Sequence, residues 1–242
     1  MKSLYGLIEK LGEISGNLLK EQLEPSSEKE WILLFAMAKS EKTLNAVVLL
    51  CKGGFGEDAT ILSRSLFELY WSVEYILSRE DDYLAKRFFA YDWIARKEMY
   101  DYAKTTPFFL EDGKETTKEI EIKAQEMQEK YHFNKYRGWS DKSIWEISEL
   151  LGHGNIYNTA YKIQCSFCHV NPRAANDYFK KGKDGEFILD AGPSNNLIKE
   201  SLFSSALVYF GIIKAFNNYF TKGLDENISD METKIKLIAS EK

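Results

Sequence analysis

Apolar residues recur at helical spacing along almost the whole chain. A spacing of three or four residues places apolar side chains on one face of an α-helix, whereas a half-buried strand alternates them with polar residues. We therefore expect a series of long helices. Thr105-Thr106-Pro107 should end the helix that begins near residue 81, and Ser194 should cap the helix that reaches residue 220. Their approximate bounds are 3–21, 29–51, 58–78, 81–104, 114–131 and 194–220. Because short connections make consecutive helices antiparallel neighbours, the sequence predicts an all-α antiparallel helical bundle.

One long segment, residues 171–193, lacks the helical pattern. Within it, Lys183-Asp184-Gly185 lies between Tyr178-Phe179 and Phe187-Ile188-Leu189, which is typical of a tight turn between two short strands. We expect a small irregular or hairpin insertion there. No internal repeat or low-complexity linker divides the chain, so residues 1–242 are expected to form a single helical domain.

The net charge of −5 comes from acidic and basic residues that are interspersed along the sequence. Nucleic-acid-binding surfaces usually show a basic surplus, so we expect no broad one, although a small basic pocket stays open. The longest uncharged apolar run, Leu202 to Ile213, is too short to cross a bilayer, and the first residues show no signal-peptide core. Three cysteines form no disulfide framework, so we expect a cytoplasmic protein that does not enter the membrane.

The helix expected at 58–78 carries unusual residues on the side opposite its leucine stripe. Arg64, Glu68, Trp71 and Tyr75 share that side, where a solvent-exposed face would carry mainly lysine and glutamate. We infer that both faces are covered and that this helix is central. Arg64 and Glu68 are then an ion pair one helical turn apart, held between aromatic rings. Such a pair either fixes the helix register or forms one edge of a ligand site.

The following helix places Arg87 and Tyr91 on its apolar face. Two neighbouring helices that each turn an arginine inward, Arg64 and Arg87, are expected to form a small anion-binding pocket. The alternative is a structural hydrogen-bond network, or a long side chain that extends to water.

A third polar group is expected near the end of the helix that carries Tyr161. Ser166 and His169 lie three residues apart, as a nucleophile and its base could, although His169 could equally close the helix. The segment Cys165 to His169 also matches the C-x-x-C-H pattern of haem attachment. That chemistry needs an exported protein, and a zinc site needs a second ligand pair. We therefore expect no cofactor and no metal.

These motifs together resemble a known family. The residues that carry the resemblance are Arg64-Ser65-Leu66-Phe67-Glu68, Arg87-x-x-x-Tyr91, Gly138-Trp139 and Tyr161-x-x-x-x-Ser166-x-x-His169. Over roughly residues 30–215 the chain resembles a family of bacterial helical proteins known only as a domain of unknown function, and it is distantly similar to HEPN domains. Those are small helical bundles that often dimerise, and many are metal-independent ribonucleases of toxin–antitoxin or phage-defence systems. The resemblance thus implies RNA or a nucleotide as partner, and a homodimer.

The resemblance also implies roles for the candidate residues. His169 would act as acid or base, and Arg64 or Arg87 would stabilise the charge of the phosphate. The pocket would further include Glu68, Tyr91, Trp139, Tyr161 and Ser166. Catalytic HEPN members carry arginine and histidine four to six residues apart on one helix, and this chain lacks that pair. The alternative is a noncatalytic ligand-sensing or protein-interaction module in which the same groups form a structural network.

Overall fold

The computed structural model describes residues 1–20, 24–105, 114–169 and 171–240. The long helices are α1 (Lys2–Leu19), α2 (Glu28–Gly53), α3 (Gly56–Leu77), α4 (Tyr83–Ala103), α5 (Lys114–Tyr131), α10 (Ile198–Phe220) and α11 (Asp225–Ser240). The short ones are η1 (Gly138–Ser140), α6 (Ile144–Leu150), α7 (Gly154–Ile156), η2 (Tyr157–Tyr161), α8 (Lys162–Cys168), α9 (Pro172–Ala175) and η3 (Asn176–Tyr178). The predicted all-α bundle is confirmed, while residues 106–107 of the predicted helix break lie outside the described ranges.

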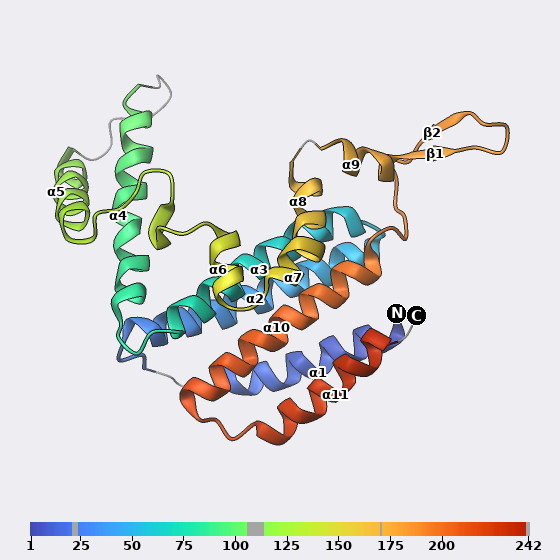
Figure 1. Cartoon of the computed structure of the whole chain (residues 1–242), viewed down its shortest axis with the longest axis horizontal. Coiled ribbons are helices and arrows are strands. Elements are labelled where there is room, and N and C mark those ends of the chain that lie inside the picture. Colours follow the sequence, from blue (N-terminus) through green and yellow to red (C-terminus); the bar gives the residue numbers. More distant parts are fainter. Residues whose placement is uncertain (21–23, 106–113, 170, 241–242) are drawn as a thin grey trace.

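Helices α2, α3 and α10 pack against one another at the centre of the bundle (Figure 1). Helix α1 packs on α10 and runs antiparallel to α11 beside it. The apolar run of the sequence forms the middle of α10, where Leu202, Tyr209 and Ile213 are fully buried. This burial removes large apolar side chains from water and supplies much of the driving force for folding.

The connection between α2 and α3 is shaped by glycines. Gly54, with φ of 83°, ends α2 in the left-handed conformation that glycine adopts without steric cost. A Cβ on Gly56 would lie 2.0 Å from the carbonyl oxygen of Asn196, so the start of α10 can approach this turn. The prediction that Ser194 caps α10 is wrong. The helix begins at Ile198, and the Ser194 N–H donates to the Gly54 carbonyl at 2.7 Å, because the tight turn brings that acceptor close.

The segment from α6 to α8 covers the remaining side of α3. Trp71 of α3 is fully buried there, with its ring 5.3 Å from that of Tyr161 and 6.1 Å from that of Tyr157. Both faces of α3 are therefore covered, as its pattern predicted. The element η2 is a single π-helical turn, which is rare and is found frequently at functional sites.

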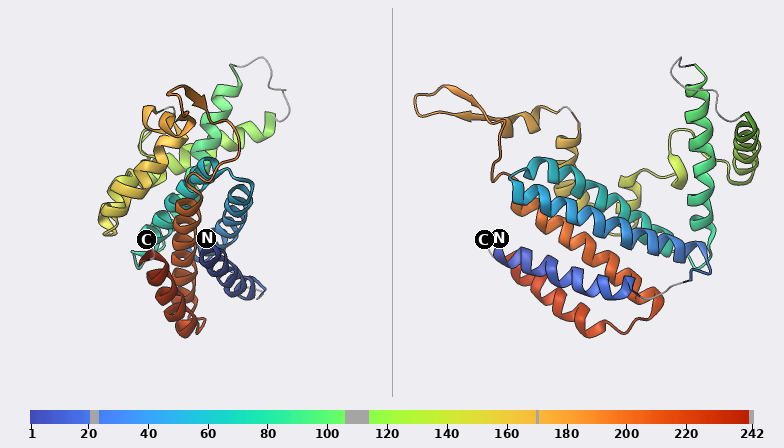
Figure 2. Two further views of the ribbon diagram at one scale, coloured as in Figure 1. Left: turned by 90° about the vertical axis from the view of Figure 1, so that its right-hand side faces the viewer. Right: turned by 180° about the vertical axis from the view of Figure 1, so that it is seen from behind.

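Two parts project from opposite ends of the central helices (Figures 1 and 2). At one end, α4 and α5 pair around a small cluster of buried residues: Ala90, Tyr131 and Phe133. At the other end, strands β1 (Phe179–Lys181) and β2 (Phe187–Leu189) form an antiparallel hairpin. The hairpin lies within 171–193, where the sequence predicted it. Over the described ranges, no helix is both long enough and apolar enough to cross a membrane.

Candidate functional site

Arg64 and Glu68 form the ion pair that their spacing predicted. Nη2 of Arg64 lies 2.6 Å from Oε1 of Glu68 and donates to the Tyr161 hydroxyl at 3.2 Å. That hydroxyl donates to the same carboxylate oxygen at 2.6 Å, and Nε of Arg64 contacts Sγ of Cys165 at 3.2 Å. Burial, and then the bond to Glu68, raise the pKa of Tyr161, so the phenol stays a donor. These bonds tie α3 to η2 and α8.

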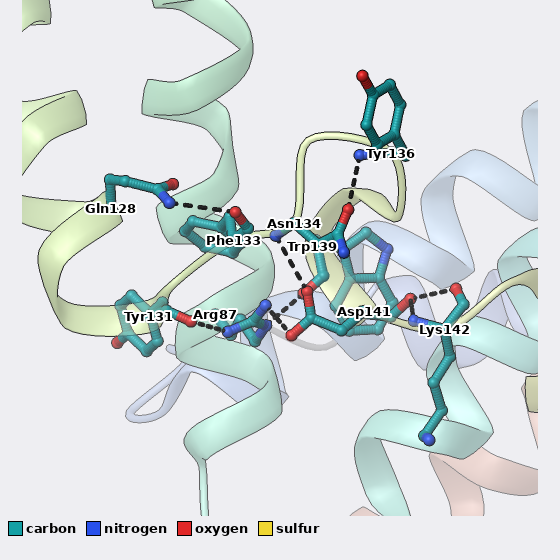
Figure 3. A network of polar contacts seen from close by, with 10 residues as sticks. Arg87, Gln128, Tyr131, Phe133, Asn134, Tyr136, Trp139, Asp141 and Lys142 are labelled. Carbon is teal, nitrogen blue, oxygen red and sulfur yellow. Dashed lines mark hydrogen bonds and ion pairs between the residues drawn. The ribbon is translucent and has the colours of Figure 1, made fainter.

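Arg87 lies in a separate network, which joins α4 to the loop before α6 (Figure 3). Its side chain is 3% exposed, and its guanidinium lies 4.4 Å from the centre of the Phe133 ring. Nε donates to the carbonyl of Trp139 at 2.5 Å, Nη1 donates to the carbonyl of Tyr131, and Nη2 pairs with Asp141. Each nitrogen of the guanidinium therefore has a protein acceptor.

The two aromatic candidates of this region lie around the Arg87 network. The ring of Tyr91 packs edge-on against Phe133, with centroids 5.3 Å apart. The indole of Trp139 packs at the same distance, 5.3 Å, against Phe88 of α4. Tyr91 thus packs on the ring that contacts the guanidinium, and the Trp139 ring holds its own loop against α4.

Ser166 and His169 do not meet. The buried hydroxyl of Ser166 donates to the backbone carbonyl of Ile163, one turn back in α8, at 2.6 Å. His169 is exposed just beyond the end of α8 and lines a cavity of about 310 Å³ with residues of α9, including Ala174. Because α8 ends at Cys168, the expected helical neighbourhood of the serine and the histidine is not formed.

Arg64 and Arg87 do not converge either. Arg64 lies in the first half of α3, and α4 starts only after α3 has ended at Leu77, roughly 20 Å further along the axis at 1.5 Å per residue. The anion pocket expected between the two arginines is therefore replaced by two separate networks. One contains Arg64, Glu68 and Tyr161, and the other contains Arg87 and the backbone of Trp139.

A third group of polar residues was missed by the sequence analysis. Glu74 of α3 accepts a hydrogen bond from the Tyr70 hydroxyl at 2.7 Å through Oε1. Its Oε2 lies 2.7 Å from Nε2 of His153. Because a carboxylate only accepts, the imidazole donates in this contact. Burial, and then the bond to Glu74, raise the pKa of Tyr70, so this phenol also stays a donor.

A pocket of about 520 Å³ lies against this group, between α3, α10 and the end of α6. Tyr70 and Glu74 form part of its wall, and Leu77, Leu151 and Ala215 supply apolar surface. The wall therefore combines apolar side chains with a carboxylate whose position is set by two donors. Among the described residues, no three His, Cys, Asp or Glu side chains gather closely enough to hold a metal ion.

The protein is thus an all-α helical bundle, and a polar group lies on the wall of a pocket beside its central helix α3. A family model described as "Family of unknown function (DUF5677)" matches residues 30–187, and the chain belongs to this family. The expected membership of an uncharacterised family is thereby confirmed. The match includes all three polar groups and ends in β2, so that α10 and α11 lie beyond it. No curated protein and no solved structure matches the chain.

Proposed function

We propose that this chain is a noncatalytic helical module that binds a small ligand in the pocket between α3 and α10. The observation that carries the proposal is the Glu74 carboxylate, which Tyr70 and His153 hold at the pocket wall. Small-molecule sites are typically cavities of roughly 300–1,000 Å³ with apolar walls and a few oriented polar groups. The pocket, at about 520 Å³, lies within that range.

The same arrangement disfavours the RNA- or nucleotide-directed activity implied by the HEPN resemblance, including a toxin or phage-defence ribonuclease. Such a site needs His169 and a free guanidinium around one phosphate. Both guanidinium groups already donate to protein acceptors, and Arg87 is almost completely buried. Turning Arg87 toward a phosphate would leave buried acceptors unpaired, at about 1–3 kcal/mol each.

Ligand binding at Glu74 can be transmitted to the rest of the chain. His153 lies just before α7 and the π-helical turn η2, and it meets α3 through Glu74. A ligand that holds the carboxylate in place stabilises this contact, and a molecule that binds only the folded state raises its stability. The segment from His153 to Tyr161 is therefore the element through which we expect the module to report occupancy.

A thermal-shift screen of small metabolites against the purified chain tests this proposal. We expect at least one compound to raise the melting temperature of the wild type and of Asp58→Asn, an exposed site on α3 away from the pocket. The shift should vanish in Glu74→Gln. RNA incubated with the wild type and with His169→Ala should stay equally intact, and degradation by the wild type alone would support the ribonuclease instead. The homodimer is proposed on the resemblance alone, and analytical ultracentrifugation tests it.

A further inference from the structure

The charge balance of the pocket identifies the chemistry of its ligand. A carboxylate offers about four acceptor positions, and Tyr70 and His153 use two of those on Glu74. The Glu74 side chain is 29% exposed and lines the pocket, so its remaining lone pairs are accessible from that side. The pocket thus presents a negative group that still has acceptor capacity.

The cation on the pocket wall does not neutralise this group. Among the described residues that line the pocket, Lys214 of α10 is the cationic side chain. Its Nζ lies 2.6 Å from Oε1 of Glu232 on α11, so its charge is paired away from Glu74. A buried or half-buried carboxylate is stabilised by an opposite charge, and here a bound molecule can supply it.

The rest of the pocket wall is partly apolar and partly polar, the polar part from Ser78, Asn218 and Tyr219. Leu77, Leu151 and Ala215 line the pocket with apolar surface that suits an alkyl chain. An ammonium group has three donors and forms short, charge-assisted bonds with a carboxylate. A carboxylic or phosphate ligand would place like charges together at Glu74, which is unfavourable.

From this balance, and resting on the proposed ligand-binding function, we propose that the pocket binds an aliphatic primary amine. Its ammonium group donates to Glu74, and its alkyl chain lies against Leu77, Leu151 and Ala215. The Lys214–Glu232 pair stays formed in the complex.

Titration calorimetry on the full chain with n-butylamine, n-butanol and butyrate, at equal ionic strength, tests this assignment. We expect the amine to bind more tightly than the alcohol, and butyrate not to bind. Glu74→Gln should lose at least about ten-fold in amine affinity, because the ammonium group then donates to a neutral amide oxygen in place of a charged carboxylate. Lys214→Met, which removes the other charge on the wall, should bind the amine at least as tightly as the wild type.

A second variant covers the case in which Glu74→Gln does not fold. Ala215→Phe keeps the carboxylate and fills the pocket, so it should lose amine binding while circular dichroism stays helical. Equal amine affinity in wild type and Glu74→Gln would overturn the assignment. If n-butanol or butyrate binds instead, and Ala215→Phe abolishes that binding, the assignment of the ligand as an amine is wrong. The proposed ligand-binding function then still stands. Absence of binding by every compound in this set and in the metabolite screen would overturn both.

Discussion

Gly211 of α10 lies so close to the ring of Tyr70 that a Cβ on this glycine would be 2.7 Å from both Cε2 and Cζ. Real Cβ atoms do not approach other atoms so closely. The Tyr70 ring can therefore occupy this position only because residue 211 is a glycine and has no Cβ. The same phenol donates to Glu74. The contact between α3 and α10 therefore determines where the carboxylate lies on the pocket wall.

Gly211→Ala should weaken both the fold and the pocket. The new methyl group must push the Tyr70 ring away, and overpacking of this kind costs about 1–3 kcal/mol, partly offset by the better helix propensity of alanine. Gly12→Ala in α1 is the matched control, because nothing lies within 4 Å of its Cβ and it should stabilise the chain. Urea denaturation compares the two, and equal stabilisation by both changes would contradict the close contact.

Arg87→Met should destabilise the chain strongly. It leaves the carbonyls of Tyr131 and Trp139 without their donor, which we expect to cost about 2–4 kcal/mol in the free energy of unfolding. Arg87→Lys should recover only part of this loss, because a single ammonium cannot reproduce the planar fork of donors.

The control for Arg87 is Arg96→Met on the same helix. Arg96 is 53% exposed and pairs with Asp92, and an exposed pair of this kind is worth less than about 1 kcal/mol. Unfolding in guanidinium chloride gives the free energy of unfolding of Arg87→Met, Arg87→Lys and Arg96→Met. If Arg87→Met and Arg96→Met have the same stability, the buried network does not hold α4 to the loop.

Much of the fold was predictable because it depends on local spacing. Trp71 and Tyr75 beside Arg64 and Glu68 indicated a helix covered on both faces, and α3 is such a helix. The turn at Lys183-Asp184-Gly185 indicated the hairpin, since turn chemistry is set by a few adjacent residues. In the first case the information lies within about three turns of one helix, and in the second it lies within one loop.

The candidate site was less predictable because its partners are distant in sequence. Glu74 looks like an ordinary solvent-facing residue of α3, and its partner His153 is 79 residues away. Asp141 pairs with Arg87 from 54 residues away in the chain. The spacing of apolar residues predicts which side chains are neighbours within one helix. It does not predict which loop residue accepts a hydrogen bond from a buried arginine.

The three cysteines should differ in reactivity toward a thiol reagent. Cys51 is 3% exposed, and burial raises the pKa of its thiol to about 11, so little thiolate is present at neutral pH. Cys165 and Cys168 are only partly buried. We expect two fast thiols in the folded chain and a third that reacts only on unfolding. Cys51→Ala should leave the fast phase unchanged, and a wild type with three fast thiols would contradict the packing of α2 against α10.

Glu146 should make the stability of the chain depend on pH in the acid range. The backbone N–H of Ser143 and then its hydroxyl, together with Arg137, lower the pKa of this carboxyl to about 2. A carboxyl whose pKa is lower in the folded than in the unfolded state adds stability above the unfolded value, about 4.3 for glutamate. That stability is lost as pH falls through the folded value.

Glu146→Gln keeps an acceptor for the capping box of α6 but cannot titrate. The wild type should therefore be more stable than Glu146→Gln above about pH 5, and the difference should shrink steadily between about pH 4 and pH 2. Thermal unfolding followed by circular dichroism at several pH values measures this difference. Glu149→Gln, an exposed change on the same helix, should follow the wild type throughout. A difference that stays constant down to about pH 2 would show that the ionised carboxylate does not hold the start of α6.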